Sequence, residues 1–162
     1  MKIFIGTDHT GFELKRKLIP FLGAFGHEVI DKGVFEFNKD DDYPDFVKLV
    51  AKAVANDLGA WGIVIGGSGQ GEAMCVNRVL GARAVVFYGP HLATQPVDVT
   101  GRQSNDSFEI VRLAREHNDA NILSLAVRFI TEEEAKQAVK IFLETPFSGD
   151  ARHIRRIKKI DD

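Results

Sequence analysis

The chain has 162 residues, 44% of them hydrophobic and 27% charged, which excludes wholesale disorder and fits one domain over residues 1–162. Its 21 basic and 23 acidic side chains give a net charge of −2, so no global basic field indicates nucleic acid or an anionic membrane as partner. The single cysteine, Cys75, excludes an internal disulfide and a cluster of metal-binding thiolates. No apolar run is long enough to span a bilayer and no signal-peptide pattern is present, so we expect a cytoplasmic protein.

Short apolar runs predict five strands, at residues 2–6, 27–31, 61–65, 82–87 and 122–126. Stretches of helical period predict helices at about 11–25, 44–58, from the turn at 66–71 to about 80, 108–116 and 132–143. This alternation predicts an α/β fold: a doubly wound, five-stranded parallel sheet with helices on both faces. The common strand order for such a sheet is 2-1-3-4-5, as in flavodoxin-like and Rossmann-like folds, and we expect it here.

Three segments interrupt the alternation. Residues 33–42 form a polar loop that we expect to face water, with four acids: Glu36, Asp40, Asp41 and Asp42. Residues 88–107 contain two prolines and two glycines and predict a long loop of the kind that is functional or mobile. The tail, 147–162, predicts a helix that carries cations and, on one face, Ile154, Ile157 and Ile160.

Ligands of an open parallel sheet bind at the carboxyl ends of the strands, where the strand order reverses. In the predicted order this point lies between the first and third strands. The loop after the first strand carries Asp8 and His9, and the loop after the third carries a glycine-rich turn and Glu72. We therefore expect these groups to face one crevice.

The turn at 66–71 has glycine at four of its six positions. It is neither a dinucleotide-binding fingerprint, which would need glycine in place of Glu72, nor a P-loop, because no Gly-Lys-Ser/Thr follows. Two interpretations remain. The turn either binds a small anion through its backbone N–H groups, with a helix N-terminus behind it, or is a tight turn that needs small residues for packing. The glycine content favours anion binding.

Several side chains also admit two interpretations. Glu72 is either an acid that only stabilises a helix N-terminus or a general base over the crevice. His117 ends a predicted helix, where a protonated histidine stabilises the helix dipole, and Cys75 lies in an apolar pattern typical of a core. Arg152 and Arg156 share one face of the tail helix with no acid expected beside them, which predicts either a solvated surface or a grip on a phosphate group.

Five motifs resemble, in order, those of the type B ribose-5-phosphate isomerases, a family that includes the galactose-6-phosphate isomerase subunits: residues 6–11, 42–45, 66–72, 115–121 and 152–156. One branch of that family uses a cysteine before the glycine turn as base, where this chain has Gly66. The other uses a glutamate after the turn, which matches Glu72. The resemblance implies that Glu72 is the base and His117 the acid, assisted by Asp8 and Ser68. It also implies a substrate-binding set: Asp8, His9, Tyr43, Gly67, Ser68, Gly69, Gln70, Gly71, Asn118, Arg128, Arg152 and Arg156.

The activity that this resemblance implies is the isomerisation of ribose 5-phosphate to ribulose 5-phosphate, a step of the pentose phosphate pathway, through a cis-enediolate and without cofactor or metal. It also implies a homodimer or a dimer of dimers, with a site shared between subunits and the tail (147–162) packed on a partner. Residues 90–107 look like an insertion relative to the family pattern, so a tetrose or hexose phosphate (erythrose 4-, allose 6- or galactose 6-phosphate) is an alternative substrate. A module that binds a phosphorylated ligand without catalysis is the alternative from another class.

Overall fold

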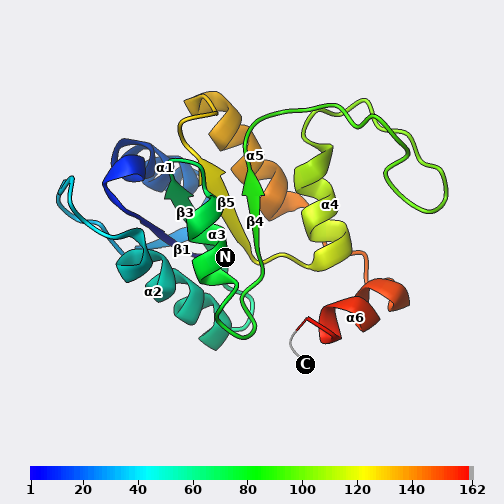
Figure 1. Ribbon diagram of the computed structural model, residues 1–162, viewed down its shortest axis with the longest axis horizontal. Coiled ribbons are helices and arrows are strands. Elements are labelled where there is room, and N and C mark those ends of the chain that lie inside the picture. The colour runs from blue at the N-terminus through cyan, green and yellow to red at the C-terminus, as the bar shows by residue number, and fades with distance from the viewer. Residues whose placement is uncertain (161–162) are drawn as a thin grey trace.

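The computed structural model describes residues 1–160 and contains one five-stranded parallel sheet between two layers of helices (Figure 1). The strands are β1 (Lys2–Thr7), β2 (Glu28–Asp31), β3 (Trp61–Gly66), β4 (Ala84–Phe87) and β5 (Ile122–Ala126). All neighbouring strands run parallel; Ile3, for example, pairs with Val29 of β2 and with Trp61 of β3. The predicted fold class is confirmed.

The order of the strands is β2-β1-β3-β5-β4, so the predicted order is wrong for the last two strands. β5 lies between β3 and β4, and its first residue, Ile122, pairs with both Gly62 and Ala84. All five residues of β5 are buried, whereas three of the four in β4 are half-buried. An uninterrupted buried run suits a central strand, and the short, partly exposed β4 suits an edge.

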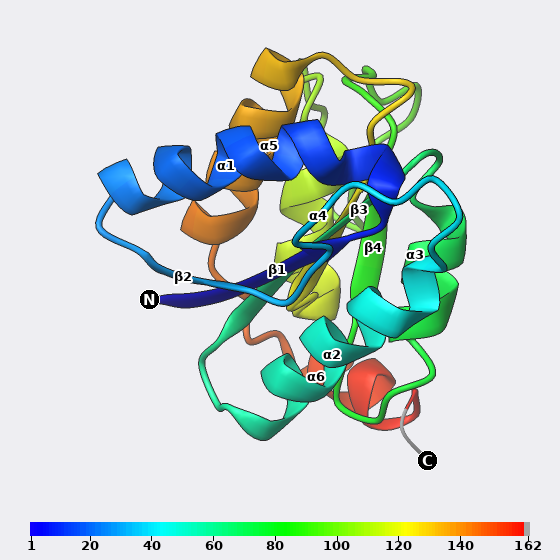
Figure 2. The ribbon, with the colours of Figure 1, turned by 90° about the vertical axis from the view of Figure 1, so that its left-hand side faces the viewer.

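The helices divide between the two faces of the sheet as the handedness of the connections requires. Crossovers between parallel strands are right-handed, so those that step toward β2 leave their helices on one face and those that step toward β4 on the other. Accordingly, α1 (Phe12–Ala24), α4 (Glu109–Asn118) and α5 (Glu132–Glu144) cover one face, and α2 (Tyr43–Asn56) and α3 (Gln70–Val76) cover the opposite face (Figure 2). The chain leaves β1 toward β2 and leaves β3 toward β4, which lie on opposite sides. The point at which the strand order reverses therefore lies between β1 and β3, as predicted.

Successive residues of the central strands feed two separate cores. Ile3 and Ile5 of β1 pack with α1, α4 and α5, whereas Phe4, between them, packs with Val47 and Val50 of α2. This alternation follows from the pleat of a strand, which points neighbouring side chains to opposite faces. Because helices cover both faces, a ligand can reach the sheet at the ends of its strands. We call the side on which the strands end the carboxyl edge and the side on which they begin the amino edge.

Two helix ends differ from the predicted positions. α3 stops at Val76 instead of near residue 80, because the Asn77 side chain bonds both backbone groups of Ala84, donating to its oxygen at 3.0 Å and accepting from its nitrogen at 2.7 Å. These bonds hold a turn that leads into β4. α4 extends to Asn118, two residues beyond the predicted end.

The predicted long loop at 88–107 has no helix or strand, and Arg102 anchors it to α4. The Arg102 guanidinium lies 2.8 Å from Glu109 Oε1 and 3.4 Å from Glu116 Oε2. The predicted tail helix is α6 (Ala151–Lys158). Residues 161 and 162, the last two of the predicted tail, lie outside the described part of the chain. Within residues 1–160, no helix has both the length and the apolar character that crossing a membrane requires.

Candidate active site

The loops after β1 and β3 meet at the carboxyl edge of the sheet, as the sequence predicts. Ile65 of β3 pairs with Thr7 of β1, so the residues that follow each strand begin side by side. Asp8 caps a short 3₁₀ helix, η1 (His9–Gly11), by accepting from the Thr10 backbone N–H at 2.9 Å. Asp8 is 7% exposed, and its charge acts on the carboxyl group of Glu72.

Three glycines of the turn at 66–71 lie where a larger side chain would collide with a predicted site residue. A Cβ built on Gly66 would overlap the carboxyl group of Glu72, and one on Gly71 would lie 2.7 Å from the Tyr43 hydroxyl. A Cβ on Gly67 would lie 3.0 Å from the Arg128 guanidinium carbon. The glycines are therefore needed for packing, because they leave space for the side chains of Glu72, Tyr43 and Arg128 beside the turn.

The same turn presents free backbone donors. Gly69 precedes α3 with φ of +71°, a left-handed conformation that favours glycine. Within residues 1–160, the N–H groups of Gly67, Ser68 and Gly69 have no hydrogen-bond acceptor. Ser68 itself is exposed, and its hydroxyl lies 3.4 Å from the N–H of Gln70. Unpaired N–H groups at a helix N-terminus are suited to bind an oxyanion, so anion binding by the turn stays a prediction beside the packing role of its glycines.

Glu72 is buried in the first turn of α3, with 5% of its surface exposed. Burial raises the pKa of its carboxyl group, the charge of Asp8 raises it further, and a backbone N–H at the helix start opposes both. The helix N-terminus favours the charged carboxylate and desolvation disfavours it, and burial is the larger effect. A carboxylate that is desolvated in this way is a stronger base than one in water.

His9 is held by an acid that sequence analysis assigned to the solvent-facing loop. Its backbone N–H and its Nδ1 both donate to Asp41 Oδ1, at 3.1 and 2.6 Å. The Asp41 side chain is only 7% exposed, so the expectation that all four acids of residues 33–42 face water is wrong for this one. The sequence contains little that could have predicted the burial of Asp41, since nothing in the run of three aspartates distinguishes the middle one. The bond leaves His9 Nε2 as the nitrogen available to a ligand.

Asp8, His9 and Asp41 also place one ligand atom each within 4.8 Å of one another, a spacing compatible with a metal ion. His9 Nδ1 and Asp41 Oδ1 bond to each other, and Asp8 Oδ1 accepts from Thr10, whereas Asp41 Oδ2 is buried without a hydrogen-bond partner in the described chain. The bonds that are present orient His9. A reaction without a metal stays our prediction.

The remaining residues at this edge come from α2, from α3 and from the segments that follow β4 and β5. Tyr43 starts α2, and Arg128 follows β5, where its N–H donates to the Gly67 oxygen at 3.1 Å. The Gln70 side chain donates to the hydroxyl of Tyr88, at the end of β4. Cys75, the alternative base by residue type, is half-buried farther along α3, and burial raises the pKa of its thiol, which disfavours the reactive thiolate.

A second group of predicted site residues lies at the opposite, amino edge of the sheet. His117 and Asn118 end α4, shortly before Ile122 begins β5 opposite Gly62, near the start of β3. Burial lowers the pKa of His117, as does the charge of Arg152, whereas Glu116 and Asp98 oppose this shift. His117 is thus stabilised as the neutral imidazole, and not as the protonated cap that its place at the end of a helix suggests.

Arg152 and Arg156 lie near this second group, on α6. The expectation that no acid accompanies them is wrong for Arg152, because Asp150 caps α6 and lies 3.3 Å from Arg152 Nε. The side chain of Arg156 is exposed and, within residues 1–160, has no ion-pair partner. One guanidinium is therefore oriented and the other is free.

The described chain does not bring the two groups together. β3 has six residues, which at about 3.3 Å per residue separates the carboxyl and amino edges by about 20 Å. Glu72 belongs to one edge and His117 to the other. The two groups of predicted site residues therefore lie at opposite ends of the strands within one copy of the chain.

The chain is similar over nearly its whole length to known proteins. The family model described as Ribose/Galactose Isomerase matches residues 3–106 and 102–160. Ribose-5-phosphate isomerase B of Mycobacterium leprae is 40% identical over 97% of this chain and 86% of its own length. Ribose-5-phosphate isomerase B of Escherichia coli is 36% identical over 98% of this chain and 93% of its own.

Solved structures show the same likeness. Ribose-5-phosphate isomerase B from Mycoplasma genitalium, with bound ribulose-5-phosphate, has a TM-score of 0.84 and 37% identity, over 99% of this chain and 93% of that one. The protein from Clostridium thermocellum has a TM-score of 0.82 and 40% identity, over 99% and 95%.

Proposed function

The chain belongs to the ribose/galactose isomerase family, and on that premise we propose that it interconverts ribose 5-phosphate and ribulose 5-phosphate. The observation that carries the proposal is the Glu72 carboxylate, buried against Gly66 beside the unpaired N–H groups of the turn. This pair of features is what an aldose–ketose isomerase needs: a base for a carbon-bound proton and donors for the oxyanion that forms. A module that only binds a phosphorylated ligand has no use for the buried base.

In the proposed reaction, Asp8 and His117 assist opening of the sugar ring. Glu72 then takes the proton from C2 of the open aldose, and the electron pair of that bond forms the C1–C2 double bond of a cis-enediolate. A proton passes from the C2 oxygen to the C1 oxygen, and Glu72 returns its proton to C1, which yields the ketose. The N–H groups of the turn and Ser68 stabilise the negative oxygen of the enediolate.

We propose further that the enzyme is a homodimer, or a dimer of dimers, in which each site combines Glu72 of one copy with His117, Asn118, Arg152 and Arg156 of another. Two-fold symmetry would bring the carboxyl edge of each chain to the amino edge of its partner and so complete two sites. The separation of about 20 Å within one chain supports this, because no movement inside a strand can close it.

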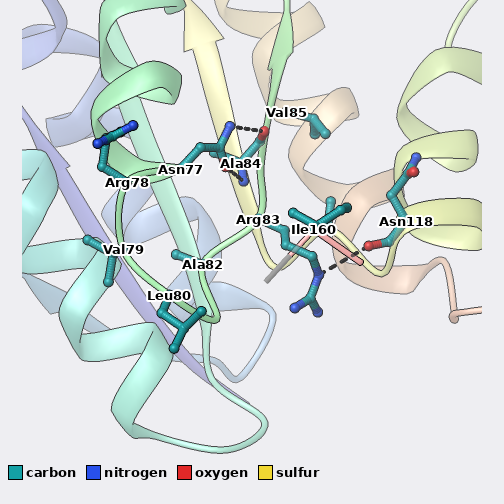
Figure 3. Close-up of a pocket in the computed structure, with 11 residues that line it drawn as sticks. Asn77, Arg78, Val79, Leu80, Ala82, Arg83, Ala84, Val85, Asn118 and Ile160 are labelled. Atoms are coloured by element: carbon teal, nitrogen blue, oxygen red, sulfur yellow. Dashed lines mark hydrogen bonds between the residues drawn. The ribbon is translucent and has the colours of Figure 1, made fainter. Parts of the chain in front are cut away.

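The surface at the amino edge supports such an assembly. A cavity of about 510 Å³ lies between the turn that leads from α3 to β4, the end of α4 and Ile160 (Figure 3). Leu80 and Ile160 border it from different segments and are 71% and 62% exposed, and Ile154 on α6 is 40% exposed. Exposed apolar side chains gathered beside a polar site are typical of an interface. The tail isoleucines therefore fit contact with a second copy.

The experiment that tests the function measures ketose formation from a panel of aldose phosphates with four, five and six carbons. We expect the highest kcat/KM with ribose 5-phosphate. A higher value with a tetrose or hexose phosphate would instead favour the alternatives that residues 90–107 leave open. Phosphate binding without turnover of any member of the panel would contradict an isomerase and favour the binding module.

A doubly charged substrate of this kind does not cross lipid, so we place the reaction in the cytoplasm.

A further inference from the structure

His153 is the one buried residue of α6, a helix that otherwise exposes most of its side chains. It is 3% exposed and lies between two residues of the proposed site. Arg152 precedes it in the chain, and the ring of His117, from α4, packs against its ring with centroids 4.3 Å apart. The proton transfers of the proposed reaction use other groups. They therefore do not explain why His153 is buried beside Arg152 and His117.

Both ring nitrogens of His153 have hydrogen-bond partners. Arg152 Nε donates to His153 Nε2 at 3.0 Å, and His153 Nδ1 lies 3.1 Å from Ser148 Oγ. A guanidinium has only donors, so Nε2 must be the unprotonated nitrogen, and Nδ1 carries the proton that is donated to Ser148. The bond from Arg152 thus selects one neutral tautomer, in which His153 has no free donor or acceptor.

This arrangement has a consequence for Arg152. Its Nε is engaged by His153, with Asp150 also nearby at 3.3 Å, while its two terminal nitrogens have no partner within residues 1–160. A guanidinium that is held by Nε keeps its two outer nitrogens oriented for a bidentate contact with a phosphate. Without the acceptor on His153, the long side chain would have to be ordered by the ligand itself, at a cost in side-chain entropy.

The contact between the rings of His153 and His117 also restrains a residue of the proposed site. The two rings are tilted by 44°, and Ser148, which accepts from His153, also donates its backbone N–H to the Glu116 oxygen at 3.2 Å, next to His117. The loop before α6, the ring of His153 and the end of α4 therefore form one hydrogen-bonded and packed unit. A shift of His153 would be transmitted to the ring of His117.

We propose that His153 is a positioning residue of the isomerase: it holds the Arg152 guanidinium ready for the substrate's phosphate and fixes the orientation of the His117 ring. This rests on the proposed function for the role of the two residues that it positions. The hydrogen bonds that define it are independent of that function.

Two variants separate the two parts of the role. His153→Phe keeps a ring against His117 but removes the acceptor, so KM and the inhibition constant of inorganic phosphate should rise about tenfold, with a smaller change in kcat. His153→Gln keeps an acceptor near the position of Nε2 but removes the ring, so KM should recover to within about threefold of the parent while kcat falls. His91→Phe, at an exposed histidine of the long loop, is the matched control and should change neither constant.

The measurement that does not depend on activity is the ¹⁵N spectrum of the His153 ring, which should show a protonated Nδ1 and an unprotonated Nε2. The opposite tautomer, or a doubly protonated ring at neutral pH, would overturn the proposal whatever the kinetics. If the tautomer is as expected but His153→Phe leaves KM and phosphate inhibition unchanged in a folded protein, His153 is only structural and the proposal fails. Ser148→Ala, a milder change, should shift KM in the same direction as His153→Phe, and covers the case in which the phenylalanine variant does not fold.

If the parent shows no isomerase activity while the tautomer is as expected, the function is wrong and the phosphate test decides the positioning role. Direct titration with inorganic phosphate should then still show weaker binding to His153→Phe than to the parent. Equal binding would overturn the proposal.

Discussion

The carboxyl group of Glu72 occupies the space that a side chain on Gly66 would fill. The two residues lie at the end of β3 and in the first turn of α3, and only the absence of a Cβ at residue 66 allows the carboxylate to rest on the strand end. In the family branch that this chain resembles less, a cysteine at that position is the base. In this chain, a side chain at residue 66 and the Glu72 carboxyl group would compete for one volume.

Gly66→Ala should lower kcat by about 100-fold, because a displacement of a catalytic group by about 1 Å has effects of that size. The new methyl group overlaps the Glu72 carboxyl group and must displace it. Steady-state kinetics with ribose 5-phosphate would show this. Gly23→Ala in α1, where a Cβ meets nothing within 4 Å, is the matched control. An unchanged kcat in Gly66→Ala would contradict the close contact.

Glu72→Gln should reduce turnover by about 100- to 10,000-fold, the usual loss when a general base is removed, and should leave inhibition by inorganic phosphate intact. Cys75→Ala should retain activity. Near-normal turnover in Glu72→Gln would remove this residue from the role of base, and strong loss in a folded Cys75→Ala would point to a thiol instead.

The raised pKa of Glu72 also predicts how stability depends on pH. The folded state binds this proton more tightly than the unfolded state, so ionisation costs folding free energy as the pH rises through the raised pKa. Glutamine carries no charge to bury. Glu72→Gln should therefore unfold at a higher temperature than the parent near pH 8, and the difference should shrink toward pH 4. A difference that is constant across this range in thermal scans would refute the assignment of a buried, ionising carboxyl.

Mixing two inactive variants tests the shared site. If each site takes Glu72 from one chain and His117 from the other, a heterodimer of Glu72→Gln and His117→Asn has one fully intact site and one doubly altered site. After random exchange of subunits, half of the dimers are mixed, so about one quarter of the parent activity should return. Activity that does not rise after exchange, with mixed dimers demonstrated by mass spectrometry, would show that both residues act within one chain.

Arg152→Ala and Arg156→Ala should each raise KM by about tenfold or more, since a charge-assisted contact with phosphate holds ground and transition states alike. Lys158→Ala and Lys159→Ala remove the same charge elsewhere on the tail and are the controls. Equal shifts in all four variants would indicate a diffuse field and not a specific clamp.

Asp41→Asn should raise KM several-fold, because the carboxylate orients His9 through two hydrogen bonds at 3.1 and 2.6 Å. The neighbouring Asp40 is exposed, so Asp40→Asn is a matched change in charge without that contact. Kinetics in which both variants behave alike would mean that the pair does not position His9.

Local sequence patterns were sufficient for much of this protein. The alternation of apolar runs and helical periods predicts a doubly wound parallel sheet, because parallel strands need helical crossovers that bury both faces. Since β1 and β3 send their chains to opposite sides, the position of the crevice follows from connectivity, and so does the meeting of Asp8 with Glu72. Glycine spacing and one acid after the turn make Glu72 a candidate base, a role that the family resemblance implies.

Only the tertiary structure decided the features that depend on contacts between distant segments. The place of β5 between β3 and β4 follows from which strand buries both faces, and the burial of Asp41 follows from a loop that folds back over His9. Likewise, whether burial or the helix N-terminus dominates the pKa of Glu72 depends on how completely α3 and the strand ends exclude water. The separation of His117 from Glu72 by the length of the sheet is of the same kind, because a sequence orders residues along the chain but does not state which edge of a sheet each one reaches.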